Sequence, residues 1–383
     1  MPDSTLPAAT RAATASGPAA KLTPRLLSLD ALRGFDMFWI VGADEIVHAL
    51  TKVSNAAPVR FLAGQLDHSD WAGFTFYDLI FPLFVFMAGV SLVFSLSRVL
   101  EAGGRGPAAW RIVRRAVLLY GLGILYYGGF ATPFHEIRLL GVLQRIALSY
   151  LFAALTFLFL GVRGRLAVLG GLLVGYWALM TFVPVPGIGA GHFEQGRNLA
   201  NWLDQHYLPW RKWDGQWDPE GLLSTLPAIG TCLLGTFAGM LLRDRSISEP
   251  RKVLYLVAAG VVLASAGWLW NLQFPVVKKL WTSSFVLVAG GYSCLLLGLF
   301  HGIIEVGGLR GWAIPFVWIG MNPITIYMIH NLVDLEKIAD RFVGGQIHEA
   351  LGAAGPLVTT AVVVAITFAI CRFLYQRKVF LRL

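Results

Sequence analysis

Residues 74–97 read FTFYDLIFPLFVFMAGVSLVFSLS, and Asp78 is the only charged side chain in this run. An apolar stretch of about 20 residues without strand-type alternation predicts a membrane-spanning helix. The whole chain has the same character, since 56% of its 383 residues are hydrophobic and 14% are charged. A soluble domain carries roughly 25% charged residues. We therefore predict an all-α, polytopic integral membrane bundle, because lipid allows only helices or closed barrels to span it.

The apolar runs predict about ten transmembrane helices. Lysine and arginine are concentrated in the segments that share a side with the N-terminus, so the positive-inside rule predicts that both termini are cytoplasmic (N-in/C-in). This asymmetry accounts for the net charge of +9 without a nucleic-acid partner. The predicted spans are 31–51, 74–97, 112–131, 139–161, 165–184, 221–242, 253–272, 281–301, 312–331 and 354–375.

Two domain-level regions are expected. Residues 1–25 are rich in Ala, Ser, Thr and Pro and contain no apolar h-region, which predicts a disordered cytoplasmic tail. Residues 26–383 form a single transmembrane domain, whose long outer loop, about 185–220, is either an aromatic belt at the interface or a sugar-binding surface. The polar stretch 332–353 reads as an outer amphipathic segment. The cysteines lie in apolar segments without metal-ligand spacing, and no metal is expected.

Charged residues within such a chain are expensive and commonly functional. His68 and Asp44 are predicted to lie together at the outer mouth of the bundle. His68 is either an interface residue or a base that works near neutral pH, since an unperturbed imidazole has a pKa near 6.5. Asp44 is either an interfacial carboxylate or the partner of that imidazole.

Two further aspartates are expected in structural ion pairs. Asp30 and Arg33 are i,i+3 neighbours and can pair at the inner end of the first span. Asp78 enters an apolar helix, where an unpaired carboxylate is penalised, so it needs a partner, and we expect Arg or His from a neighbouring span.

The fourth span opens with Arg138, Gln144 and Arg145. The two arginines are seven residues apart and share a helix face, so they can hold phosphate or carboxylate groups, or pair with the aspartates of other spans. Asp218 and Glu220 stand at the start of a helix, where carboxylates suit the dipole and the unpaired N–H groups.

The last third of the chain adds polar residues to apolar segments. Lys278 lies on the predicted outer side, against the charge trend, just before Trp281, which indicates an anionic ligand or a carboxylate partner. Asn322 and Pro323 interrupt the ninth span, and His330 stands near its end. A broken helix commonly lines a cavity.

In this order, these segments resemble the heparan-α-glucosaminide N-acetyltransferase family and its bacterial relatives, over nearly the whole membrane region. Several segments in a fixed order are a more specific signal than any one of them. The matching stretches are Ser28–Gly34, Asp44, His68–Trp71, Asp78–Gly89, Gly141–Arg145, Asp218–Gly221, Lys278–Trp281, Gly320–Asn322 and His330.

The resemblance implies transfer of the acetyl group of cytoplasmic acetyl-CoA to an amine, such as that of a terminal glucosamine, on the other side of the membrane. It implies that His68 is the active histidine and that Asp44 stands where the family has an important asparagine. We expect His68 to act as general base with Asp44 orienting it, and an acetyl-histidine intermediate is the alternative. The expected cofactor contacts are Arg33, Arg138, Gln144, Arg145, Asn322 and His330, and the expected substrate contacts are Asp218, Glu220, Lys278 and Trp281.

Functions of other classes stay open at this stage. A transporter of an amino sugar or organic anion explains the buried charges and the broken ninth span equally well. A non-catalytic scaffold or receptor explains the aromatic outer loop, but not the number of intramembrane charges. The expected partners are acetyl-CoA, an amine acceptor and the lipid bilayer, the expected location is a bacterial cytoplasmic (inner) membrane, and a homodimer is consistent with the resemblance.

Overall fold

The structure is a computed structural model that describes residues 26–381, so the predicted disordered tail at 1–25 lies outside it. The described residues form helices and loops, without a β-strand. The α-helices are α1 (Leu27–Phe38), α2 (Asp44–Val53), α3 (Ala57–Leu66), α4 (Phe76–Gly103), α5 (Arg105–Tyr126), α6 (Val142–Phe159), α7 (Val162–Phe182), α8 (Leu199–Tyr207), α9 (Thr225–Arg243), α10 (Glu249–Trp270), α11 (Ser283–His301), α12 (Ile314–Gly320), α13 (Pro323–Leu332), α14 (Leu335–Val343), α15 (Gln346–Leu351) and α16 (Gly355–Gln376).

The predicted all-α polytopic class is confirmed. Among the described residues, seven helices are long and apolar enough to cross a membrane, and the bent pair α12–α13 makes eight. Two of the ten predicted spans fall outside this set. Span 31–51 is divided between α1 and α2, and α5, in span 112–131, begins with a half that contains Arg111 and Arg115. The total of ten spans remains a prediction.

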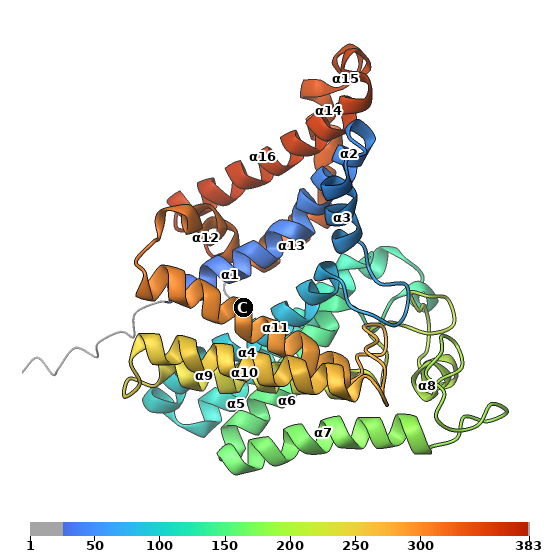
Figure 1. Cartoon of the computed structure of the whole chain (residues 1–383), viewed down its shortest axis with the longest axis vertical. Coiled ribbons are helices and arrows are strands. Elements are labelled where there is room, and N and C mark those ends of the chain that lie inside the picture. The colour runs from blue at the N-terminus through green and yellow to red at the C-terminus, as the bar shows by residue number, and fades with distance from the viewer. Residues whose placement is uncertain (1–25, 382–383) are drawn as a thin grey trace, which may run out of the picture.

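The first span is broken by its own sequence. Between α1 and α2 lies a π-helical turn, Trp39–Ala43, in which Gly42 has φ +116°. Only glycine adopts that conformation readily, because it has no Cβ. The break redirects the chain, so α2 leaves the line of α1 (Figure 1).

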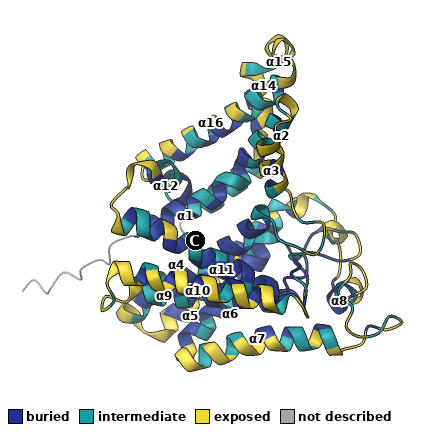
Figure 2. Cartoon of the chain, in the orientation of Figure 1, coloured by how far each residue is buried: buried dark blue, intermediate teal, exposed yellow. Residues whose placement is uncertain are grey.

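Close contacts between helices hold the centre of the bundle together. A Cβ on Gly89 of α4 would lie 2.0 Å from the Cys232 carbonyl oxygen, and a Cβ on Gly235 of α9 would lie 1.9 Å from that of Phe86. Small residues at such crossings allow backbones to approach within van der Waals distance, which drives helix association in lipid. In Figure 2, α4 and α11 are mostly buried, whereas α7 and α10 have long exposed faces.

Two polar segments are more ordered than predicted. The outer loop 185–220 contains α8, which Asn198 caps by accepting a hydrogen bond from the Asn201 N–H group. The stretch 332–353 forms α14 and α15, and α14 packs against α16 near α2 and α3 (Figure 1). Local capping explains the first difference, since an Asn at the helix start satisfies an N–H group that would otherwise be unpaired.

Candidate active site

The loop before α4 is fixed by a capping box that the sequence contains at Thr75–Asp78. Thr75 is the N-cap of α4, and its N–H group donates to Asp78 Oδ2 at 3.2 Å. The same carboxylate oxygen accepts hydrogen bonds from the backbone and the hydroxyl of Ser69, at 3.2 and 2.8 Å. A reciprocal cap of this kind fixes the entry of the chain into the helix. Here it also holds the residue that follows His68.

Asp78 binds the histidine as well. Its Oδ1 atom lies 3.0 Å from His68 Nδ1, and the Asp78 carboxylate is fully buried. Because an ionised carboxylate can only accept, Nδ1 carries the proton in this contact and Nε2 is left as the basic nitrogen. The His68 side chain is half exposed, so the imidazole is held from one side and accessible from the other. The predicted partner of Asp78 is thus found, on the adjoining loop.

Lys278 completes the cluster from the loop between α10 and α11. Its Nζ atom lies 2.9 Å from His68 Nδ1, 3.2 Å from His68 Nε2 and 3.4 Å from Asp78 Oδ1. With the proton on Nδ1, only Nε2 can accept a hydrogen bond from the Lys278 ammonium group. An isolated β-bridge between Ala72 and Val277 joins the two loops. Burial lowers the pKa of the Lys278 amine, and the Asp78 carboxylate opposes that shift. This arrangement explains the position of Lys278 against the charge trend.

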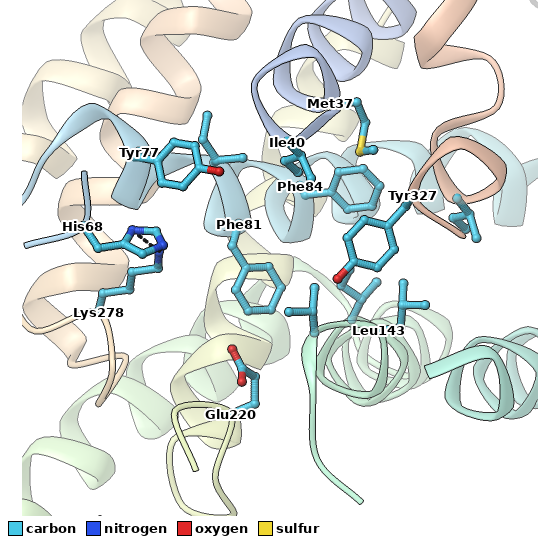
Figure 3. Close-up of a pocket in the computed structure, with 14 residues that line it drawn as sticks. Met37, Ile40, His68, Tyr77, Phe81, Phe84, Leu143, Glu220, Lys278 and Tyr327 are labelled. Carbon is cyan, nitrogen blue, oxygen red and sulfur yellow. Dashed lines mark hydrogen bonds between the residues drawn. The ribbon is translucent and has the colours of Figure 1, made fainter. Parts of the chain in front are cut away.

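Asp44 does not orient the imidazole in the way that the sequence suggests. It accepts a hydrogen bond of 2.7 Å from the Tyr77 hydroxyl, and the Tyr77 ring lies 4.8 Å from the His68 ring, centroid to centroid. The orienting carboxylate is Asp78, because α4 places it directly behind His68. Asp44 therefore reaches the histidine through Tyr77, which Figure 3 shows beside His68 and Lys278.

Two connected cavities meet at this cluster. The first, which we call the histidine cavity, has a volume of about 220 Å³ and is mostly apolar. The second, the vestibule, has about 460 Å³ and is lined by carboxylates, lysines and aromatic rings. His68, Lys278 and Glu220 line both of them. Figure 3 shows Phe81 between His68 and Tyr327 in the histidine cavity.

The predicted cofactor residue Arg138 is instead the centre of a buried ion cluster. It donates to both oxygens of Asp218, at 2.8 and 2.6 Å, and also to Glu220. The rings of Tyr127 and Trp213 lie against its guanidinium group, at 4.5 and 4.9 Å. The cluster forms one wall of the vestibule. The sequence left open whether Arg138 binds a ligand or pairs with carboxylates. The structure shows the pairing, because Asp218 and Glu220 lie next to its guanidinium group.

Gln144 and Arg145 lie deeper, among side chains rather than in a cavity. Gln144 is fully buried and its amide donates to the Arg138 carbonyl at 3.3 Å. Arg145 is buried above the Trp281 ring, with 4.9 Å between the guanidinium carbon and the ring centroid. Trp281, a predicted substrate contact, borders the vestibule but is buried and donates to the Thr231 hydroxyl. The predicted shared helix face does not form, because α6 begins at Val142 and Arg138 lies in the loop before it.

A third hollow, the arginine pocket, has a volume of about 250 Å³ and collects basic residues from two helices. Arg33 of α1 lies there with Arg111 and Arg115 of α5, close to Ser91 and Ser95 of α4. Arg33 pairs with Asp30 at 3.4 Å, as predicted, and donates to the Ser91 hydroxyl at 2.7 Å. The sequence offered one signal for the other two arginines, because i,i+4 spacing places them on the same face of a helix.

The ninth span contributes differently from prediction. Asn322 lies at the 64° bend between α12 and α13 and is buried, with its amide bonded to the backbone of residues 379 and 381. His330 lies two turns along α13 and lines none of the three hollows. His330 was expected to contact the cofactor, but the residue of α13 that lines the histidine cavity is Tyr327, which the sequence did not indicate.

The three hollows lie in series along the bundle and share lining residues. The histidine cavity and the arginine pocket share the apolar residues Phe84, Leu143, Ile146 and Ile324. Asp78, at the vestibule, and Ser95, at the arginine pocket, are 17 positions apart on α4. At 1.5 Å per residue that separation is about 26 Å, close to the ~30 Å of a hydrocarbon core.

Together, fold and site define a polytopic membrane protein with a His–Asp–Lys centre in a series of hollows along the bundle. The chain belongs to the heparan-alpha-glucosaminide N-acetyltransferase family, whose catalytic-region profile matches residues 25–267. This match contains His68 and Asp78 and ends before Lys278.

Two curated relatives carry the same name. The heparan-alpha-glucosaminide N-acetyltransferase of Homo sapiens is 26% identical over 428 aligned residues, which cover 94% of this chain and 60% of the relative. That of Mus musculus is 27% identical over 381 residues, which cover 82% of this chain and 56% of the relative. The chain thus spans somewhat more than half of the length of these relatives.

Proposed function

We propose that the protein is a membrane-bound acyltransferase, which moves the acetyl group of acetyl-CoA to the amine of an amino sugar. The observation that carries this proposal is a series of three hollows with shared lining residues. Three arginines lie in one of them, and an accessible histidine with a buried carboxylate behind it lines the other two. The family membership and the names of its relatives point to the same chemistry.

The donor fits these hollows with its phosphates at the arginine pocket. Guanidinium groups bind phosphate oxygens through directed, charge-assisted hydrogen bonds. Arg33, Arg111 and Arg115 provide such groups, and the hydroxyls of Ser91 and Ser95 lie beside them. The apolar neck at Phe84 and Leu143 suits the uncharged pantetheine arm, which would bring the thioester to His68. Under the N-in arrangement the arginine pocket faces the cytoplasm, where acetyl-CoA is made.

The acceptor fits the vestibule. Asp70, Asp214 and Glu220 provide carboxylates there, and Trp213 provides a flat aromatic face. Sites that bind polar ligands combine such surfaces with a few placed hydrogen-bonding groups. Under the N-in arrangement this end is extracytoplasmic, which in a bacterial cell places the acceptor outside the inner membrane.

His68 acts as the general base in this proposal. The acceptor nitrogen attacks the thioester carbonyl carbon, a C–N bond forms and the C–S bond breaks. The proton lost by the amine passes to His68 Nε2 and then to the departing CoA thiolate, so the products are an amide and the free thiol. Asp78 keeps the Nδ1 proton in place and stabilises the imidazolium.

Lys278 is placed to balance negative charge. Its ammonium group borders both the histidine cavity and the vestibule, so it can stabilise the oxyanion of the tetrahedral intermediate. Tyr77 packs on His68 and limits its rotation, while Asp44 holds the Tyr77 hydroxyl. In the alternative route, in which His68 itself is acetylated, the same neighbours orient the imidazole.

The test measures thiol release from acetyl-CoA by the purified protein with glucosamine as acceptor. We expect His68→Ala to lower the rate at least ~100-fold, the size of a typical general-base contribution. The matched control is His135→Ala, because that histidine is exposed and lines none of the three hollows.

An absence of thiol release from the unmodified protein, together with uptake of glucosamine into proteoliposomes without acetyl-CoA, would contradict the transferase function and favour a transporter. Full activity of His68→Ala would show that His68 is not the general base. Radiolabelled acetyl-enzyme that forms without acceptor would favour the covalent route.

A further inference from the structure

We propose that Asn322 is a positioning residue for the donor, because it holds residues 379–381 as one wall of the arginine pocket. The segment then determines how tightly the nucleotide end of the thioester binds. This inference rests on the proposed function, since it assumes that the arginine pocket receives the phosphates.

The amide of Asn322 makes two hydrogen bonds to one short segment. Its Nδ2 atom donates to the Val379 carbonyl at 3.0 Å, and its Oδ1 atom accepts from the Leu381 N–H group at 3.1 Å. Asn322 is buried, whereas Val379 and Leu381 are more than half exposed, so the two bonds tie a surface segment to a buried side chain. Bonds to the backbone of residues i and i+2 resemble the pairing of one strand with another and keep the segment extended.

The turn before this segment needs such support. Helix α16 ends at Gln376, and Lys378 has φ +56°. A residue with a side chain adopts this left-handed conformation at an energetic cost. The Val379 N–H group donates to the Leu374 carbonyl at 3.0 Å, which closes the turn on the helix side. Beyond the turn, the Asn322 amide binds the backbone of residues 379 and 381.

The bonded segment and the bend in the ninth span face the same hollow. Phe380 and Leu381 line the arginine pocket from the segment, and Met321 and Pro323 line it from either side of Asn322. The amide therefore connects two parts of one wall. The sequence predicts Asn322 to touch the cofactor, whereas the structure gives both ends of its amide to the backbone.

The same bend also supports an arginine. Arg33 Nη1 donates to the Gly320 carbonyl at 3.2 Å. A Cβ on Gly320 would lie 1.9 Å from the Asp30 carbonyl oxygen, so the bend packs directly on α1. The basic group and the wall that faces it are thus fixed by neighbouring residues of one bend. Loss of the Asn322 amide would free the wall and leave the histidine cluster, outside the arginine pocket, unchanged.

The test compares two thioesters on the Asn322→Ala variant. Acetyl-CoA carries the nucleotide end, and S-acetyl-N-acetylcysteamine lacks it. We expect the KM for acetyl-CoA to rise about tenfold with kcat nearly unchanged, and the KM for the short thioester to stay at the wild-type value. Asn322→Asp keeps the acceptor for Leu381 but loses the donor to Val379, so its KM should lie between the two. Asn55→Ala, at an exposed asparagine, is the control.

A second variant covers the case in which Asn322→Ala does not fold. Phe380→Ala changes the wall and keeps the Asn322 side chain, and it too should raise the KM for acetyl-CoA alone. Unchanged KM values in the folded variants, or equal changes for both thioesters, would overturn the positioning role. A wild-type protein that transfers no acetyl group from acetyl-CoA would instead overturn the proposed function.

Discussion

The substitution Asp78→Asn changes the charge and hydrogen bonding of the site while keeping its shape. Asp78 Oδ2 accepts from the N–H group and hydroxyl of Ser69 and from the N–H group of Thr75, and Oδ1 accepts from His68. An amide has only one oxygen to offer. The three donors at Oδ2 keep that oxygen, so the NH₂ group faces His68 and donates to Nδ1.

The expected effect follows from where the imidazole proton then resides. If Nδ1 accepts a hydrogen bond, the proton moves to Nε2 and the basic lone pair points away from the substrate. In a serine protease the equivalent aspartate-to-asparagine change lowers kcat about 10⁴-fold through the wrong tautomer. At 1.36 kcal/mol per tenfold, that is about 5.4 kcal/mol of transition-state stabilisation. From the tautomer effect we expect a fall in kcat on the order of 10³ to 10⁴. Lys278 also loses its carboxylate partner in this variant.

The assay is thiol release from acetyl-CoA, with thermal stabilisation by CoA as the measure of folding. Ser69→Ala is the matched control, since it removes one hydrogen bond of 2.8 Å to Asp78 and leaves the carboxylate charged. We expect that control to stay within about tenfold of wild type, in line with the loss of roughly 1 kcal/mol for one hydrogen bond. A folded Asp78→Asn protein with kcat within tenfold of wild type would refute the assignment of Asp78 as orienting residue.

Three further predictions concern stability. Gly235→Ala brings a Cβ to 1.9 Å from the Phe86 carbonyl oxygen, so it should destabilise the fold by about 1–3 kcal/mol in thermal unfolding, whereas Gly175→Ala, with open space around it, should not. Arg138→Ala leaves the buried carboxylates of Asp218 and Glu220 without their cation, so it should lower the free energy of unfolding by about 3–5 kcal/mol. The measurement is a lower melting temperature and yield, and a variant that melts like the wild type would contradict the ion cluster. Burial raises the pKa of Asp204 to about 6, so the protonated carboxyl stabilises the fold below pH 4 and this stabilisation is lost as pH rises through 6. The free energy of unfolding of the wild type should fall by on the order of 3 kcal/mol over that window. An Asp204→Asn protein with the same pH profile would exclude this group.

Much of the fold follows from the apolar runs, because each long run has to satisfy its backbone within a helix. The breaks were less predictable. The π-helical turn at Gly42 depends on one left-handed residue, and the sequence has many glycines that do not break a helix. Helix α8 depends on a local cap inside a polar loop, where no periodic pattern indicates a helix.

Within the site, the sequence identified the residue types and misassigned several partners. His68 was singled out mainly because it falls in an ordered series of segments that resemble the family, and Asp78 because a carboxylate there needs a cation. The prediction extended the helix to Arg138, whereas α6 begins at Val142. Arg138 and Arg145 were therefore expected together at the cofactor, although Arg138 is held by carboxylates and Arg145 by packing. The partnership of Lys278 with His68 depends on a bridge between loops about 200 residues apart, which no local pattern encodes.

The central claim, that the thioester donor extends through the bundle from the arginine pocket to His68, is tested most directly by a structure of the protein with CoA bound. We predict phosphate groups within hydrogen-bonding distance of Arg33, Arg111 or Arg115 and the CoA sulfur in the histidine cavity beside His68. A nucleotide bound in the vestibule against Lys279, or a sulfur outside the histidine cavity, would contradict the account.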